Sequence, residues 1–70
     1  MAQGDHLRFC FGVDAVAFTV TVPRVGEDAH YIEAFGVDGK FIGIARFVPP
    51  PDAAFNVWLN QDGSVNVTFH

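Results

Sequence analysis

Three histidines are the residues of this chain whose chemistry would matter most if they met. His6, His30 and His70 could together hold a zinc ion through their imidazole nitrogens. Zinc ligands in small domains normally occur as closely spaced local pairs, and these histidines lie far apart in the sequence. The sequence therefore predicts solvated histidines at strand ends, with no metal and no cofactor.

The single cysteine, Cys10, is the strongest nucleophile in the sequence. It lies between Phe9 and Phe11 in an alternating apolar segment, and the sequence identifies no histidine that would activate it. The glycines of the stretch FGVDG are not followed by the Lys-Ser/Thr pair of a phosphate-binding loop. We therefore expect Cys10 to be an ordinary strand residue and the protein not to be an enzyme.

Trp58, the only tryptophan, is the main candidate for ligand binding. Alternation places its ring on one face with Asn56 and Asn66. Such a surface is typical of sugar binding, because an indole can stack on a pyranose while amides bond its hydroxyl groups. Tyr31 is a further candidate for this role. The alternative is that the rings pack against a partner subunit, since tryptophan is enriched at protein interfaces.

Composition limits the remaining functions. The chain has 70 residues, enough for a single domain over 1–70. Its net charge is −4 and its four basic residues are scattered, which argues against nucleic acid as a partner. No apolar run approaches the roughly 20 residues that cross a bilayer, so no membrane association is expected. One cysteine, and no charged-then-apolar leader in MAQGDHLRF, favour a cytoplasmic protein.

The elements expected to position these residues are β-hairpins. The stretch FGVD occurs at 11–14 and again at 35–38, and Asp62 of NQDG lies 24 positions after Asp38. Asp-Gly between alternating apolar runs is a strong hairpin signal, because both residues tolerate positive φ. The sequence predicts an all-β fold of three consecutive antiparallel hairpins, consistent with a pseudo-threefold repeat, in a curved sheet or small barrel. Short helices over 28–35 and 52–59 are the alternative.

The last hairpin has a predicted register. A three-residue loop over 61–63 sets Leu59 opposite Val65 and keeps the apolar side chains of FNVWL and VNVTF on one face. This loop requires Gly63 at positive φ. The first hairpin would pair 6–13 with 15–22, although Ala15 stands where the other turns have glycine.

The same register has consequences for both ends of the sheet. It places His30 opposite Arg46 and His70 opposite Ala54. If the three hairpins stand side by side, their turns, centred on Asp14, Asp38 and Asp62, gather at one end of the molecule and the three histidines at the other.

The middle hairpin is apolar on both faces. In KFIGIARF, alternation puts Phe41 and Phe47 on one side and Ile42 and Ile44 on the other. Together with Phe35, these residues form the predicted interface of a homo-oligomer, most simply a dimer, because a core this small without a disulfide gains from association. The sequence thus favours a non-catalytic structural or protein-interaction module, with a small-ligand or carbohydrate-binding module as the alternative.

Overall fold

The computed structural model describes residues 6–21 and 24–70. Within these ranges the elements follow in the order β1 (His6–Cys10), β2 (Ala17–Thr21), β3 (His30–Phe35), the short 3-10 turn η1 (Val37–Gly39), β4 (Phe41–Phe47), β5 (Phe55–Leu59) and β6 (Ser64–Phe69). The alternative of helices over 28–35 and 52–59 is therefore wrong, because both segments contribute strands.

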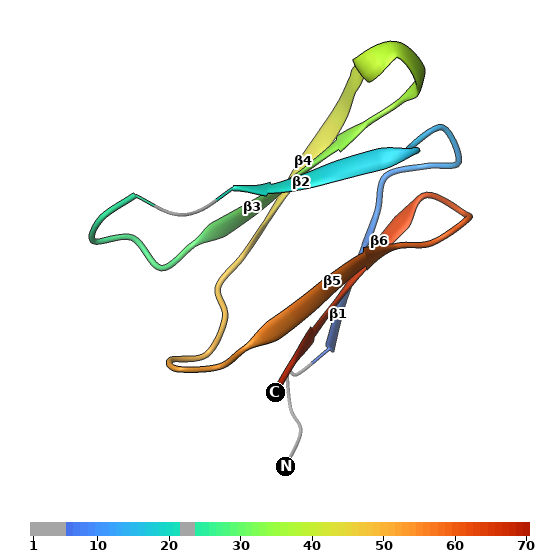
Figure 1. Ribbon diagram of the computed structural model, residues 1–70. Coiled ribbons are helices and arrows are strands. Elements are labelled where there is room, and N and C mark those ends of the chain that lie inside the picture. The colour runs from blue at the N-terminus through green and yellow to red at the C-terminus, as the bar shows by residue number, and fades with distance from the viewer. Residues whose placement is uncertain (1–5, 22–23) are drawn as a thin grey trace.

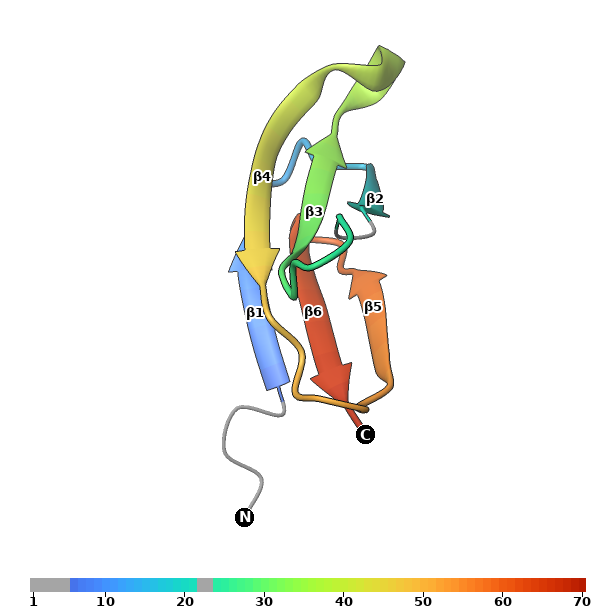
Figure 2. The ribbon, with the colours of Figure 1, turned by 90° about the vertical axis from the view of Figure 1, so that its left-hand side faces the viewer.

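The strands form two three-stranded antiparallel sheets, ordered β1-β6-β5 and β2-β3-β4. Figure 1 shows them edge-on as two layers, and in Figure 2 the lower end of β3 overlaps the upper end of β6. The chain passes from one layer to the other through residues 11–16 and returns through 48–54, at opposite ends of the sandwich (Figure 1). The fold is all-β as predicted, but the described strands close no barrel and do not form three consecutive hairpins.

The core lies between the two layers. Ile32 of β3 and Val65 and Val67 of β6 are fully buried, and Phe47 of β4 completes their cluster. Half-buried apolar side chains surround this cluster: Leu7, Phe9, Phe11, Phe18, Val20, Phe55, Val57, Leu59 and Phe69. Alternation of apolar and polar residues along each strand accounts for this arrangement, because successive side chains point to opposite faces.

The predicted first hairpin is wrong. β1 pairs with β6, with Leu7 opposite Val67, while β2 pairs with β3. Residues 11–16 connect the two sheets through a turn in which the Ala15 N–H donates to the Gly12 carbonyl at 3.0 Å. Alternation of apolar and polar residues determines which face of a strand is buried, but it does not determine which strand pairs with it. The observed pairing makes β6 a central strand, which allows Val65 and Val67 to be fully buried.

The predicted register of the last hairpin is confirmed. Leu59 lies opposite Val65, and the φ of Gly63 is 85°. The His70 N–H donates to the Ala54 carbonyl at 2.8 Å, as that register requires.

The middle hairpin departs from its predicted register at a β-bulge. Phe35 lies opposite Phe41, but the next pair is Ala34 with Gly43, so Ile42 is an extra residue on β4. Beyond the bulge every pair is shifted by one position, and His30 lies opposite Phe47 rather than the predicted Arg46. The bulge also overturns the predicted faces of β4: Phe47 points into the core, while Phe41 is exposed.

Residues 11–16 contact the other two turns at one end of the sandwich, although this segment joins the two sheets and is not the predicted hairpin turn. The Phe11 N–H donates to the Gly63 carbonyl at 3.2 Å. The carbonyl oxygen of Asp14 lies 3.3 Å from where a Cβ on Gly36 would sit. This end of the sandwich is therefore held together by backbone packing.

Within the described residues, no helix has the length and apolar character needed to cross a lipid bilayer.

Candidate binding surfaces

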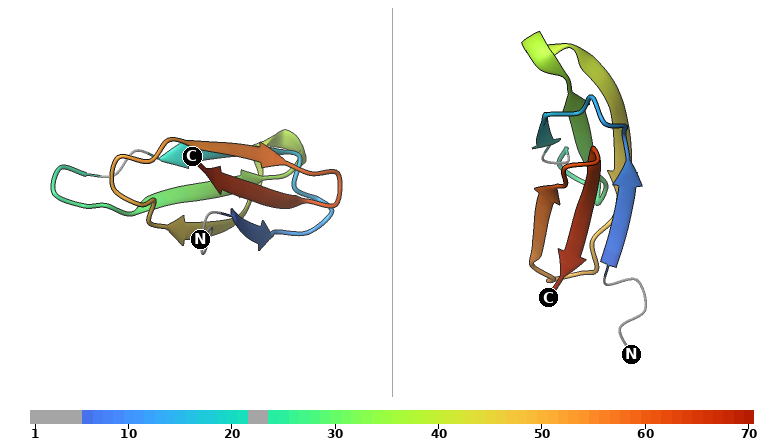
Figure 3. Two further views of the ribbon diagram at one scale, coloured as in Figure 1. Left: turned by 90° about the horizontal axis from the view of Figure 1, so that it is seen from below. Right: turned by 90° about the vertical axis from the view of Figure 1, so that its right-hand side faces the viewer.

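The β1-β6-β5 sheet turns its outer face toward the viewer in Figure 3 (right). This face is polar and carries Trp58 of β5. Asn66 of the central strand lies opposite Trp58 on one side and Arg8 on the other. The adjacent row consists of His6, Thr68 and Asn56. Side chains opposite one another in an antiparallel ladder point to the same side of the sheet. The indole of Trp58, 43% exposed on the edge strand β5, therefore has amide side chains as its neighbours.

Asp62, in the β5–β6 turn, is one end of a hydrogen-bond network on this face. Its carboxylate accepts hydrogen bonds from the Ser64 hydroxyl at 2.6 Å and the Ser64 backbone N–H at 2.9 Å. Arg8 Nη2 donates to the other carboxylate oxygen at 2.7 Å. These hydrogen bonds, the Ser64 hydroxyl foremost, and the Arg8 charge lower the pKa of Asp62 below its ordinary value of 3.8.

The network continues across the sheet through two asparagines. Asn60 Nδ2 lies 3.0 Å from the Ser64 hydroxyl oxygen and also contacts Asn66 Oδ1. Asn66 Nδ2 in turn lies 2.8 Å from Nε2 of His6. Side chains of β1, β6 and the β5–β6 turn are thereby joined into one polar chain.

The structure brings together three of the four residues predicted to bind a ligand. Asn56, Trp58 and Asn66 share the polar face, because their strands form the predicted hairpin. Tyr31 lies on β3, opposite Arg46, on the outer face of the other sheet. It cannot contribute to the same site as Trp58.

The outer face of the β2-β3-β4 sheet carries an apolar patch formed by Phe35, Phe41 and Ile44. The rings of Phe35 and Phe41 meet edge to face with their centroids 6.1 Å apart. Phe41 is 54% and Ile44 53% exposed. Phe47 lies in the core, and Ile42 is half-buried against Gly36. Only three of the five predicted interface residues therefore lie in this patch.

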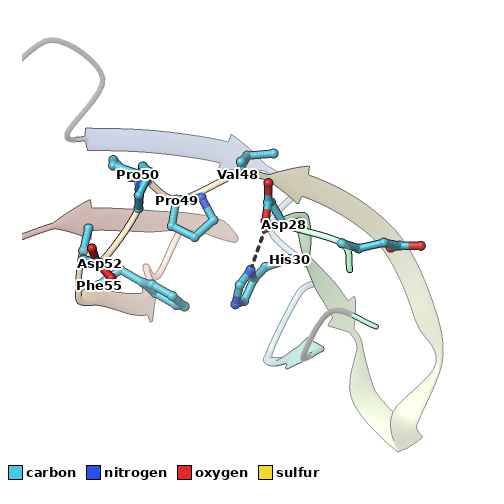
Figure 4. Close-up of a pocket in the computed structure, with 10 residues that line it drawn as sticks. Asp28, His30, Val48, Pro49, Pro50, Asp52 and Phe55 are labelled. Carbon is cyan, nitrogen blue, oxygen red and sulfur yellow. Dashed lines mark hydrogen bonds between the residues drawn. The ribbon is translucent and has the colours of Figure 1, made fainter. Parts of the chain in front are cut away.

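A shallow pocket of about 380 Å³ lies where the 48–54 connection meets the start of β3 (Figure 4). Its wall includes the prolines 49–51 and the carboxylates of Asp28 and Asp52. The His30 ring stacks on Phe47 with centroids 5.5 Å apart, and its Nδ1 lies 3.3 Å from the Asp28 carbonyl oxygen. The pocket thus offers acidic groups and one packed imidazole, without a nucleophile.

The three histidines and Cys10, the residues considered for metal binding or catalysis, belong to different parts of the structure. His6 bonds to Asn66 and His70 Nε2 lies 2.9 Å from Asn56 Nδ2, whereas His30 belongs to the pocket. Among the described residues, no three His, Cys, Asp or Glu side chains are grouped closely enough to hold a metal ion. Cys10 is exposed on the polar face, opposite Ser64.

Sequence reasoning missed the hydrogen-bond network of the polar face. Arg8 and Asp62 are 54 positions apart, and only the unexpected pairing of β1 with β6 brings them together. The one local signal was the Asp-x-Ser order at the β5–β6 turn, since an aspartate commonly caps the backbone N–H two residues later.

No protein-family model matches the chain, and no curated protein or solved structure shows significant similarity to it. Its function must therefore be sought in the chemistry of the two outer faces.

Proposed function

We propose that this protein is a non-catalytic interaction module that self-associates through the apolar patch of the β2-β3-β4 sheet. The observation that carries the proposal is the exposure of Phe41 and Ile44 beside Phe35 on one outer face. Contiguous exposed apolar side chains on a small domain are typical of a protein-protein contact. Burying them would gain roughly 25 cal/mol for each Å² of apolar surface removed from water.

The charges beside the patch favour a second copy as the partner. Glu33 lies opposite Ile44 in the ladder, and Arg46 is the next outward-facing residue of β4. Neither side chain takes part in a salt bridge within the described residues. In a two-fold contact the same surface is used by both subunits, so each Glu33 can pair with the Arg46 of the other. Such a contact would bury both patches and neutralise both charges.

Association would also compensate for a small core. The central cluster contains Ile32, Phe47, Val65 and Val67, and Cys10 is the only cysteine, so no internal disulfide can form. Domains of this size bury a low fraction of their chain surface and are marginally stable alone. A dimer contact would add apolar burial on the outer face of the β2-β3-β4 sheet, where Phe41 and Ile44 are exposed.

Sedimentation of Ile44→Lys tests the proposal. We expect the wild-type protein to sediment as a dimer at tens of micromolar, with a melting temperature that rises with protein concentration. Ile44→Lys should sediment as a monomer, because a charge at the centre of the patch cannot be desolvated. Val25→Lys is the matched control, since Val25 is fully exposed in a loop outside the patch.

A wild-type monomer with a concentration-independent melting temperature would contradict self-association. Equal weakening by Ile44→Lys and Val25→Lys would show that the contact lies elsewhere. Circular dichroism of both variants establishes that each has retained its fold.

A further inference from the structure

We infer that the polar face of the β1-β6-β5 sheet is a second binding surface, which accepts a neutral pyranose sugar stacked on Trp58. This face lies on the opposite side of the sandwich from the apolar patch (Figure 1), so the inference is independent of self-association. It rests on an exposed indole beside two amides, of which Asn66 is oriented by the hydrogen-bond network from Asp62 and Asn56 contacts His70.

The direction of every hydrogen bond in the network follows from the charge of Asp62. An ionised carboxylate only accepts, so the Ser64 hydroxyl must donate its proton to Asp62. The Ser64 oxygen can then only accept, which makes Asn60 Nδ2 its donor. The other proton of that nitrogen goes to Asn66 Oδ1. Asn66 therefore directs its Nδ2 group toward His6, which accepts through Nε2.

This ordering leaves a defined set of hydrogen-bonding groups around the indole. Asn66 uses one N–H for His6 and retains the other, directly across the ladder from Trp58. Asn56 lies two residues before Trp58 on the same face. Its Nδ2 lies 2.9 Å from His70 Nε2, and its carbonyl oxygen stays available as an acceptor beside the second N–H. Among the described residues, no protein group accepts the indole N–H. Donors and an acceptor held beside an apolar ring match the hydroxyl groups and the C–H face of a pyranose.

Charge favours a neutral ligand. The charged side chains assigned to this network are Arg8 and Asp62, and their 2.7 Å ion pair leaves no net charge between them. The paired charges offer no unpaired partner to an anionic or cationic ligand, and a neutral sugar needs none. Because β5 is an edge strand, one side of the indole is free of a neighbouring strand and a terminal sugar ring can approach from there.

NMR of the indole N–H tests this inference directly, because Trp58 is the only tryptophan and gives a single indole signal. The titrants are the α and β methyl pyranosides of glucose, galactose, mannose and N-acetylglucosamine. Sorbitol is the control, since it has the hydroxyl groups of a hexose without a rigid ring face. We expect a saturable shift with at least one pyranoside, at a dissociation constant on the order of 1 mM, and none with sorbitol.

Variants identify the contact. Trp58→Ala should weaken binding about tenfold or more, as for other central aromatic contacts, and Trp58→Phe should weaken it less. For Trp58→Ala the backbone signal of Asn66 replaces the indole signal. Asn66→Asp removes the free N–H and should weaken binding several-fold. Tyr31→Ala, on the other sheet, should leave it unchanged.

Three results would overturn the inference. The first is the lack of a saturable shift with every pyranoside, and the second is an equal shift with sorbitol. The third is an indole signal that moves with protein concentration alone, which would mean that a second copy covers Trp58. Repeating the titration with the Ile44→Lys protein keeps the result separate from any association through the apolar patch.

Discussion

Each of the two sheets contains a hairpin that turns at an Asp-Gly pair, and the two turns have different surroundings. Gly39 and Gly63 both have positive φ, 76° and 85°. A Cβ added to Gly39 would meet nothing within 4 Å, whereas one added to Gly63 would overlap the Gly12 carbonyl. The same dipeptide thus produces similar glycine backbone conformations, while tertiary packing determines how much each glycine is needed.

The outer faces of the two sheets also differ, since one is apolar and the other is polar. On the β2-β3-β4 sheet, Phe41 and Ile44 are exposed with no covering element within the described chain. On the β1-β6-β5 sheet, the side chains are bonded to one another from Asp62 to His6. A sheet with satisfied polar groups is stable in water without a cover, whereas an apolar face gains from one. The difference suggests separate tasks for the two faces.

The largest expected effect comes from substituting the two turn glycines. Gly63→Ala should lower the free energy of unfolding by roughly 3 kcal/mol or more, because backbone strain adds to the overlap with Gly12. Gly39→Ala should cost only about 1 kcal/mol, from backbone strain alone. Urea denaturation of both variants measures the difference. Equal costs would mean that the connection at Gly12 does not pack against the β5–β6 turn.

Exchanging charges at the apolar patch should have an intermediate effect. Glu33→Arg or Arg46→Glu alone places like charges together in the two-fold dimer and should weaken it about tenfold. The double variant restores opposite charges and should regain most of the affinity. Sedimentation equilibrium measures the dissociation constants of the wild type, the two single variants and the double variant. A double variant as weak as the single ones would exclude the proposed pairing of Glu33 with Arg46.

The smallest expected effect is on the stability of the fold at acid pH, where the Asp62 carboxylate is protonated and loses its charge. Because its pKa is lowered in the folded state, the carboxylate stabilises the fold above pH 3.8, and this contribution disappears as the pH falls through the folded-state pKa. NMR titration of the Asp62 carboxyl should show a larger rise in pKa for Ser64→Ala than for Arg8→Gln. The opposite order would mean that the exposed ion pair dominates over the hydroxyl hydrogen bond.

The parts of the structure that sequence reasoning predicted depend on neighbours along the chain. The Leu59–Val65 register followed from alternation together with loop length, and the same register put Trp58 and Asn66 on one face. The partner of β1 could not be predicted, because apolar alternation at Leu7 is satisfied by any strand that buries the same face.

Neither the β-bulge in β4 nor the hydrogen-bond network of the polar face could be predicted from the sequence. Ile42 is the extra residue of the bulge, and the next residue, Gly43, lies close to the Phe11 ring, a contact that exists only after the two sheets meet. Without this bulge, alternation placed Phe47 with Phe41, although one is buried and the other exposed. The polar chain from Asp62 likewise depends on β1 lying beside β6.

The pairing of β1 with β6 also affects the order in which the strands assemble during folding. Arg8 and Asp62 are separated by 54 positions, whereas the β3–β4 and β5–β6 hairpins join neighbouring segments. Hairpins form in roughly 1–10 μs, and domains dominated by non-local strand pairs fold on the order of milliseconds to seconds. The half of the polar face on β5 and β6 can therefore assemble early, while β1 joins late, after a large loop has closed. Stopped-flow fluorescence of Trp58 would resolve that slow step, and complete folding within microseconds would contradict it.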